Sequence, residues 1–144
     1  MTEPVHRHML GVDLGERRIG LAVSDPTGLL AGALRVLQSQ GRARDVAAVA
    51  EVAREEGVEA VVVGVPVSMD GSYGPMAEKS RKFGDMLAEQ LGRPVVYWDE
   101  RLTTTEASRY LRDAGMRAEK RRQTIDAAAA AVLLQSYLDY LRRR

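Results

Sequence analysis

Three acidic residues lie where the surrounding sequence pattern is expected to turn a carboxylate toward the protein interior: Asp13, Glu100 and Asp126. Asp13 interrupts the apolar run from Met9 to Leu14, Glu100 comes shortly after an apolar run that ends at Trp98, and Asp126 shares a helical stripe of apolar residues. Carboxyl groups with ordinary pKa values of about 4 are ionised at neutral pH. Three converging negative charges repel one another unless cations lie between them.

Carboxylate oxygens without histidine or cysteine favour Mg²⁺ or Mn²⁺ over Zn²⁺. Two such ions about 4 Å apart can cleave a phosphodiester, because one activates water and the other stabilises the leaving oxygen. The three acids therefore predict metal-dependent hydrolysis of phosphodiester bonds. Two simpler interpretations stay open. Asp13 would turn toward solvent at the end of its strand, or Asp126 would be an acid favoured at a helix N-terminus by the helix dipole.

Basic residues adjoin each of the three acids in the sequence. The expected substrate-binding residues are Arg17, Arg18, Arg101, Lys120, Arg121 and Arg122. Arginine and lysine contacts to phosphates position a nucleic acid without reading its sequence, so these clusters predict salt-sensitive binding of a structured nucleic acid. The alternative is that each cluster is a solvated charged face. An aromatic content of 5% argues against a base-stacking platform for single strands.

The elements that would position these residues follow from hydrophobic periodicity. Strands are expected at about 9–14, 19–24, 29–37, 60–64 and 94–98, and helices from about 44 to Gly57, 75–91, 103–113 and 125–141. A basic linker is expected at 117–122. Short connections make the first three strands antiparallel, and βαβ crossovers add the last two. This predicts an α/β fold with one mixed five-stranded sheet flanked by helices, and the order of elements resembles a ribonuclease H-like fold.

Length and composition restrict the kind of protein. A chain of 144 residues with 45% hydrophobic residues is expected to form one domain, with a flexible leader at 1–8, the domain at 9–141 and a basic tail at 142–144. His6 and His8 are expected to belong to that leader and not to a metal site. The polar N-terminus and the lack of a long apolar run predict a cytoplasmic protein with no membrane partner.

Four short motifs make the sequence similar to a known family, the YqgF-like proteins, which are related to Holliday-junction resolvases. The motifs are Gly11-Val12-Asp13-Leu14-Gly15 with Arg18-Ile19-Gly20-Leu21-Ala22-Val23-Ser24-Asp25, Gly64-Val65-Pro66 with Met69-Asp70-Gly71, Asp99-Glu100-Arg101-Leu102-Thr103-Thr104, and Lys120-Arg121 with Asp126 and the alanines that follow. The resemblance covers about residues 9–141.

The resemblance implies a ribonuclease H-like nuclease that uses Asp13, Glu100 and Asp126 to bind metal, with Mg²⁺ or Mn²⁺ as cofactor. It also implies a role in maturation of precursor 16S ribosomal RNA, with cleavage of branched DNA as the alternative. The chain is expected to act as a monomer or as a homodimer. A homodimer would supply the two active sites that junction-cleaving enzymes require. For a fourth carboxylate ligand the candidates are Asp25, Asp70 and Asp99.

Two other functions are compatible with parts of the sequence. An apolar strand that carries Asp13-Leu14-Gly15 also resembles the phosphate-binding hairpin of sugar kinases and actin-like ATPases. Such enzymes need a second domain to enclose the nucleotide, for which this chain has no room. The other alternative is a non-catalytic nucleic-acid-binding or protein-interaction module that keeps the fold and the acids.

Overall fold

The computed structural model describes residues 7–102 and 118–143, and the side chains of 7–102 and 126–143. The described strands are β1 (Met9–Leu14), β2 (Arg18–Ser24), β3 (Ala31–Gln38), β4 (Ala60–Val65) and β5 (Val95–Asp99). The helices are α1 (Arg42–Glu56), α2 (Pro75–Leu91) and α4 (Ala118–Arg143), and a short 3₁₀ helix, η1 (Glu100–Leu102), follows β5. The strands form one mixed sheet in the order β3-β2-β1-β4-β5, which confirms the predicted five-stranded architecture.

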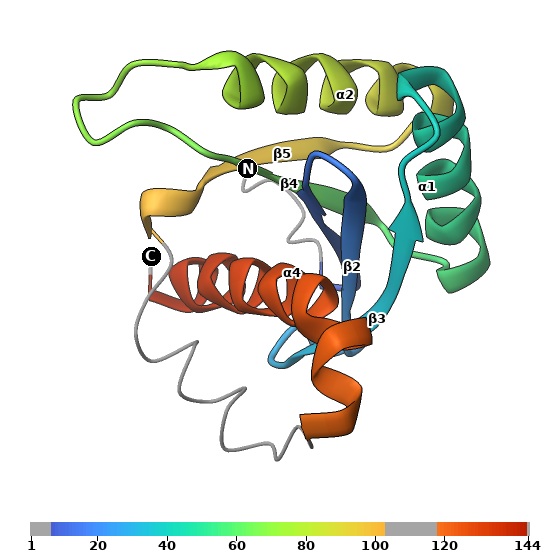
Figure 1. Ribbon diagram of the computed structural model, residues 1–144. Helices are drawn as coiled ribbons and strands as arrows, with labels where there is room; N and C mark the ends of the chain where they lie inside the picture. The colour runs from blue at the N-terminus through green and yellow to red at the C-terminus, as the bar shows by residue number, and fades with distance from the viewer. Residues whose placement is uncertain (1–6, 103–117, 144) are drawn as a thin grey trace.

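The sheet separates two helical layers (Figure 1). Helices α1 and α2 cover one face, and α4 crosses the other, where it packs mainly on β2, β3 and β1. Side chains alternate between these faces along each strand. In β1, Leu10 and Val12 join the core beneath α1 and α2, whereas Met9 joins the core beneath α4. By the same alternation, Asp13 lies on the face covered by α4.

Local signals account for the ends of two helices. Gly57 and Gly92 end α1 and α2 in the left-handed conformation, with φ of 68° and 71°. Pro75 occupies the first turn of α2, where its missing N–H donor and fixed φ are tolerated. These predictions are confirmed.

The N-terminal part of α4 differs from the prediction. We expected a basic linker at 117–122 and a helix from about Ile125, but the helix already begins at Ala118. Lys120, Arg121 and Arg122 therefore lie in the helix. The residues from Ala118 to Gln123 are good helix formers and include neither glycine nor proline, so a cluster of charges was mistaken for a chain break. The helix expected at 103–113 lies outside the described residues.

The structure also differs from the expected leader (1–8) and tail (142–144) at the residues next to the domain. The ring nitrogens of His8 lie 2.8 Å from the carbonyl oxygens of Ser24 and Glu56, so His8 is held against the domain. At the other end, α4 continues through Arg143, and Arg142 forms an ion pair with Asp139 one turn earlier.

An aromatic cluster joins β5 to α4. The ring of Trp98, which is 8% exposed, lies 5.1 Å from that of Tyr137 and 5.2 Å from that of Tyr140, measured between ring centroids. The Trp98 Nε1 atom is buried without a hydrogen-bond partner among the described residues. These contacts hold the strand that precedes Glu100 against the helix that carries Asp126.

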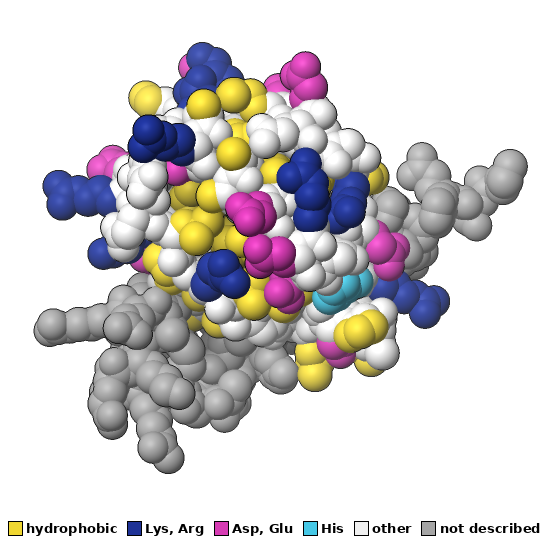
Figure 2. Space-filling view, turned by 90° about the vertical axis from the view of Figure 1, so that its right-hand side faces the viewer, with side chains coloured by type: hydrophobic (Ala, Val, Ile, Leu, Met, Phe, Trp, Pro, Cys, Tyr) yellow, Lys and Arg dark blue, Asp and Glu magenta, His cyan; other side chains and the backbone are white. Residues whose placement is uncertain are grey.

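The face of the molecule around α1 and β3 carries both acidic and basic side chains, with a short row of adjoining acidic side chains near its centre (Figure 2). The net charge of the chain is only +1, so any phosphate-binding surface must come from a local cluster of basic residues. Within the described ranges, no helix combines the length and the apolar character that crossing a bilayer requires.

Candidate active site

Asp13 lies between two glycines on the α4 side of the sheet. Its antiparallel partner on β2 is Gly20. On β4, the parallel register pairs Val12 with Val63, so the next residues along the two strands are Asp13 and Gly64. Because neither glycine has a side chain, the space on both sides of Asp13 is open to groups from other elements.

Glu100 enters this space from the side of β4. An added Cβ on Gly64 would lie 2.7 Å from Oε1 of Glu100, so the carboxyl group occupies the place that a side chain would fill. A hydrogen bond joins the carboxyl groups of Glu100 and Asp13. Burial, the charge of Asp13 and this hydrogen bond raise the pKa of Glu100 to about 7. Burial also raises the pKa of Asp13.

Asp126 approaches from the side of β2. An added Cβ on Gly20 would lie only 1.9 Å from the backbone oxygen of Asp126, so α4 rests directly on the strand at this point. Asp126 lies more than two turns inside α4. The interpretation of Asp126 as a helix N-terminal acid is therefore wrong. The interpretation of Asp13 as an acid turned toward solvent is also wrong, because its carboxyl group is hydrogen-bonded to Glu100.

The Asp126 carboxylate is bound by arginine. Nε of Arg18 donates to Oδ2 of Asp126 at 2.7 Å. The charge of Asp126 nevertheless contributes to the raised pKa of Asp13. Within 7–102 and 126–143, no three acidic or histidine side chains are placed to hold an ion together. The structure thus brings the predicted acids to one place, with two of them in contact and the third held by Arg18.

A cavity of about 380 Å³ opens beside the acids and is lined by Asp13, Glu100, Ala129, Val132 and Leu133. Its carboxyl groups lie at the end of the sheet where β1 and β5 finish, and its apolar wall comes from α4. Ordinary ligand pockets have this volume and this mixture of apolar wall and few polar groups. The cavity is therefore the place where a ligand would meet both Asp13 and Glu100.

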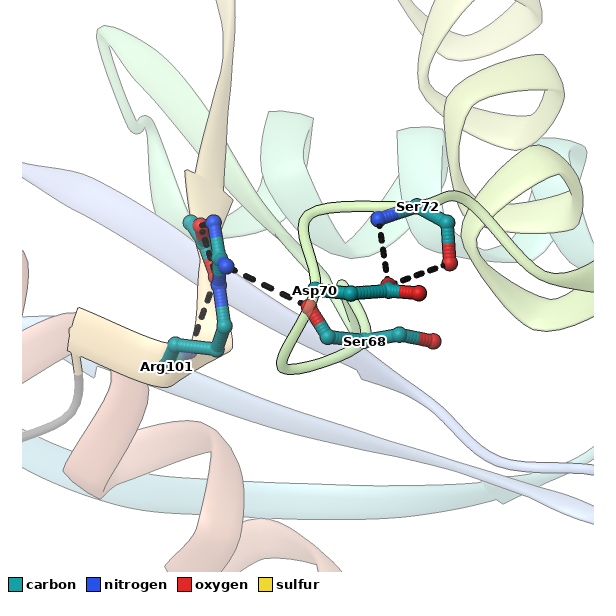
Figure 3. Close-up of polar contacts among 5 residues, drawn as sticks. Ser68, Asp70, Ser72 and Arg101 are labelled. Atoms are coloured by element: carbon teal, nitrogen blue, oxygen red, sulfur yellow. Dashed lines mark hydrogen bonds and ion pairs between the residues drawn. The ribbon is translucent and has the colours of Figure 1, made fainter.

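Arg101 connects the end of β5 to the loop between β4 and α2. Its guanidinium donates to both carboxylate oxygens of Asp99, and its Nη1 donates to the carbonyl oxygen of Ser68 at 3.2 Å (Figure 3). In the same loop, Asp70 accepts hydrogen bonds from the backbone N–H and hydroxyl of Ser72. Arg101 is therefore paired with Asp99 and links the end of β5 to this loop.

The three candidates for a fourth carboxylate have other partners. Asp25 accepts hydrogen bonds from Thr27 and Leu29 in the β2–β3 turn, at the opposite end of the sheet from Asp13. Asp70 is bonded to Ser72, and Asp99 is bound by Arg101. These bonds lower the pKa of each carboxyl group. Asp99 is close enough for its charge to contribute to the raised pKa of Glu100, but alternation along β5 places it on the α2 side of the sheet.

The remaining predicted substrate-binding residues are less constrained. Arg17 is exposed in the turn between β1 and β2. The backbone of Lys120, Arg121 and Arg122 is helical, and their side chains lie outside the described residues.

Sequence reasoning missed the glycines that let the acids approach one another. Gly11, Gly20 and Gly64 lie on the α4 side of three adjacent strands, and an added Cβ on each would come within 3.0 Å of an atom of α4 or Glu100. A sequence signal was present, because glycine weakens a strand interior unless another group approaches closely. The alanines that follow Asp126 predict a close approach of this helix to the sheet, and the glycines of β1, β2 and β4 that face it are the missed half of that signal.

The raised pKa of Glu100 predicts how stability depends on pH. Its pKa in the folded protein, about 7, lies above the ordinary value of 4.5. Between these values the folded protein holds a proton that the unfolded chain has released, so the unfolding free energy falls as pH rises through this window. Glu100 is partly exposed, and solvent screening limits the expected fall to about 1 kcal/mol. Urea unfolding in chelator, from about pH 5 to 8, should show a shallower fall for Glu100→Gln than for wild type. Equal slopes would contradict the raised pKa of Glu100.

Comparison with known proteins connects this geometry to a family. The model of the RuvX family, described as Holliday junction resolvase, matches residues 7–140. A protein of Caldanaerobacter subterraneus subsp. tengcongensis named as a pre-16S rRNA nuclease is 46% identical over 91% of this chain and 95% of its own length. A protein of the same name from Symbiobacterium thermophilum is 49% identical over 90% of each chain.

Solved structures show the same fold. The RuvC of T. thermophilus in complex with a Holliday junction substrate has a TM-score of 0.70, with 19% identity over 96% of each chain. The Fowlpox virus resolvase bound to Holliday junction DNA has a TM-score of 0.58, with 14% identity over 93% of this chain and 98% of its own. These likenesses confirm the predicted ribonuclease H-like fold.

Proposed function

This chain belongs to the RuvX family, which is the YqgF-like family that its motifs indicated, and it is a nuclease of that family; we propose that it uses Mg²⁺ or Mn²⁺ to cleave precursor 16S ribosomal RNA. The proposed metal binding is supported by the contact between the carboxyl groups of Asp13 and Glu100, with Asp126 on the neighbouring helix. The substrate rests on the curated relatives, which are named for that RNA. A cytoplasmic location is part of the same proposal.

The three acids fit a divalent cation in chemistry and in backbone position. All supply hard oxygen ligands, and a cation would offset the charge of Asp13 that helps to raise the pKa of Glu100. Asp126 completes the set if its carboxylate turns from Arg18 toward Asp13. When bound, the cation would activate water and stabilise the leaving oxygen of the phosphodiester.

The chain's own residues would bind and orient the substrate. Arg17 stands exposed at the turn beside Asp13, and it would contact a phosphate of the backbone without reading a base. The apolar wall of the cavity, formed by Ala129, Val132 and Leu133, would restrict water around the reacting phosphate. Lys120, Arg121 and Arg122, whose backbone belongs to the first turns of α4, remain candidates for further phosphate contacts.

Branched DNA is the second candidate substrate, because the family model is described as a Holliday junction resolvase. The non-catalytic module remains the third candidate. Contacts to phosphates serve RNA and DNA equally. Symmetric cleavage of a junction requires two active sites, and therefore a homodimer, whereas trimming of a precursor RNA can be carried out by a monomer.

The test is cleavage of end-labelled precursor 16S ribosomal RNA and of a four-way DNA junction, side by side, with Mg²⁺, Mn²⁺ or chelator. We expect metal-dependent cleavage of the RNA. Paired symmetric nicks in the junction alone would transfer the function to DNA, and cleavage that persists in chelator would contradict the metal-dependent mechanism. Binding of both nucleic acids without cleavage of either would favour the module.

A further inference from the structure

Arg18 and Asp126 form an ion pair between the sheet and α4. Arg18 is the first residue of β2, and its Nε lies 2.7 Å from Oδ2 of Asp126. The side chains are 55% and 31% exposed, so solvent reaches the pair and its two members can separate. Arg18 and Gly20 are two residues apart and therefore point to the same face of the sheet, the face on which α4 lies.

The backbone of Asp126 is already in place for a second partner. Asp126 rests on Gly20, and Gly20 is paired across the strands with Asp13. A change in the side-chain torsions of Asp126 would therefore move its carboxylate from Arg18 toward the Asp13–Glu100 pair without moving the helix. In the position bound to Arg18, Asp126 does not form a three-acid group with Asp13 and Glu100.

We propose that Arg18 is a positioning residue that couples metal binding to substrate binding. In the metal-free protein it holds Asp126 away from Asp13 and Glu100, and when Asp126 joins them it is released to bind a phosphate of the nucleic acid. This inference rests on the proposed metal-dependent function. It deepens that function by assigning an order in which the residues of the site become available.

Two consequences follow from the shared carboxylate. Removal of the guanidinium should tighten metal binding, because Asp126 then has one competitor fewer. The coupling should also be reciprocal, so metal should strengthen nucleic-acid binding through Arg18. Exposed ion pairs are weak, and each effect is therefore expected to be about two- to fivefold.

The first experiment measures Mn²⁺ affinity from the electron paramagnetic resonance signal of free Mn²⁺. Arg18→Gln is compared with Arg17→Gln, which removes the same charge from the neighbouring exposed position. We expect Arg18→Gln to bind Mn²⁺ about two- to fivefold more tightly than Arg17→Gln. In an Asp126→Asn background the two substitutions should have equal effects. Equal effects in the wild-type background, or a difference that survives Asp126→Asn, would overturn the proposal, as would a wild-type protein that binds no Mn²⁺.

The second experiment measures RNA affinity, with a short RNA hairpin in chelator and in Ca²⁺, under conditions where a gel shows the hairpin intact. Ca²⁺ should tighten binding by wild type and Arg17→Gln, and this gain should disappear in Arg18→Gln. A gain that remains in Arg18→Gln would overturn the coupling. Both experiments read binding alone. Coupling without cleavage would therefore sustain this inference while the proposed function fails, and cleavage without coupling would do the reverse.

Discussion

Asp126→Asn should lower the rate of RNA cleavage by about 10³-fold or more while leaving the affinity for RNA within about threefold. The substitution keeps the shape of the side chain but removes a charge expected to help hold the cation, and a loss of about 4 kcal/mol of transition-state stabilisation corresponds to about 10³-fold in rate. Single-turnover cleavage and equilibrium binding of the same RNA separate the two effects. A fall in affinity without a fall in single-turnover rate would contradict the assigned role.

The control for this experiment is Asp139→Asn. Asp139 lies on the same helix, and its carboxylate pairs with Arg142 and accepts a hydrogen bond from Gln135. An asparagine there can still accept that bond, so cleavage should stay within about twofold of wild type. Equal losses in the two variants would mean that α4 tolerates no such change, and the three-acid mechanism would lose its support. Unchanged cleavage in Asp126→Asn would disprove that mechanism directly.

Gly20→Ala should destabilise the protein by about 3 kcal/mol or more and should also abolish cleavage. The added methyl group would lie 1.9 Å from the backbone oxygen of Asp126, and backbone atoms packed against a sheet cannot move aside as the end of a flexible side chain can. Overpacking of an ordinary core position costs about 1–3 kcal/mol, and a clash with backbone belongs at or beyond the upper end. Urea unfolding monitored by circular dichroism measures the loss.

Gly32→Ala is the matched control. Gly32 is in the strand next to β2, and an added Cβ there meets no atom within 4 Å. Its unfolding free energy should remain within about 0.5 kcal/mol of wild type or rise slightly, because alanine restricts the unfolded chain. If Gly20→Ala were as stable as Gly32→Ala, α4 would not rest on β2 at Asp126, and the position assigned to that acid would be wrong.

The strands and the predicted acids could be inferred because each has a local signal. Alternation and short apolar runs predicted β1 and β4, and the glycines after α1 and α2 predicted where these helices end. The convergence of Asp13 and Glu100 followed from the places of β1 and β5 in one sheet. Their hydrogen bond confirms that convergence.

What could not be inferred depends on contacts between residues far apart in the sequence. The predicted substrate-binding residues Arg18 and Arg101 are paired with Asp126 and Asp99 respectively, and the sequence indicated neither pair. Nothing in a linear pattern tells whether an arginine beside an acid will meet that acid, another one or a ligand. The same limitation applies to Gly20, whose importance comes from a helix that begins about a hundred residues later.

The position of Trp98 gives the protein an internal optical reporter. Trp98 is the single tryptophan of the chain, it is buried, and its ring contacts two tyrosines of α4. Indole emission responds to the polarity and the aromatic neighbours around the ring, so the fluorescence of the unlabelled protein arises at the junction between β5 and α4. Glu100 follows this strand directly, and Asp126 belongs to this helix. The relative position of β5 and α4, and with it that of Glu100 and Asp126, can therefore be monitored by Trp98 fluorescence without measuring cleavage.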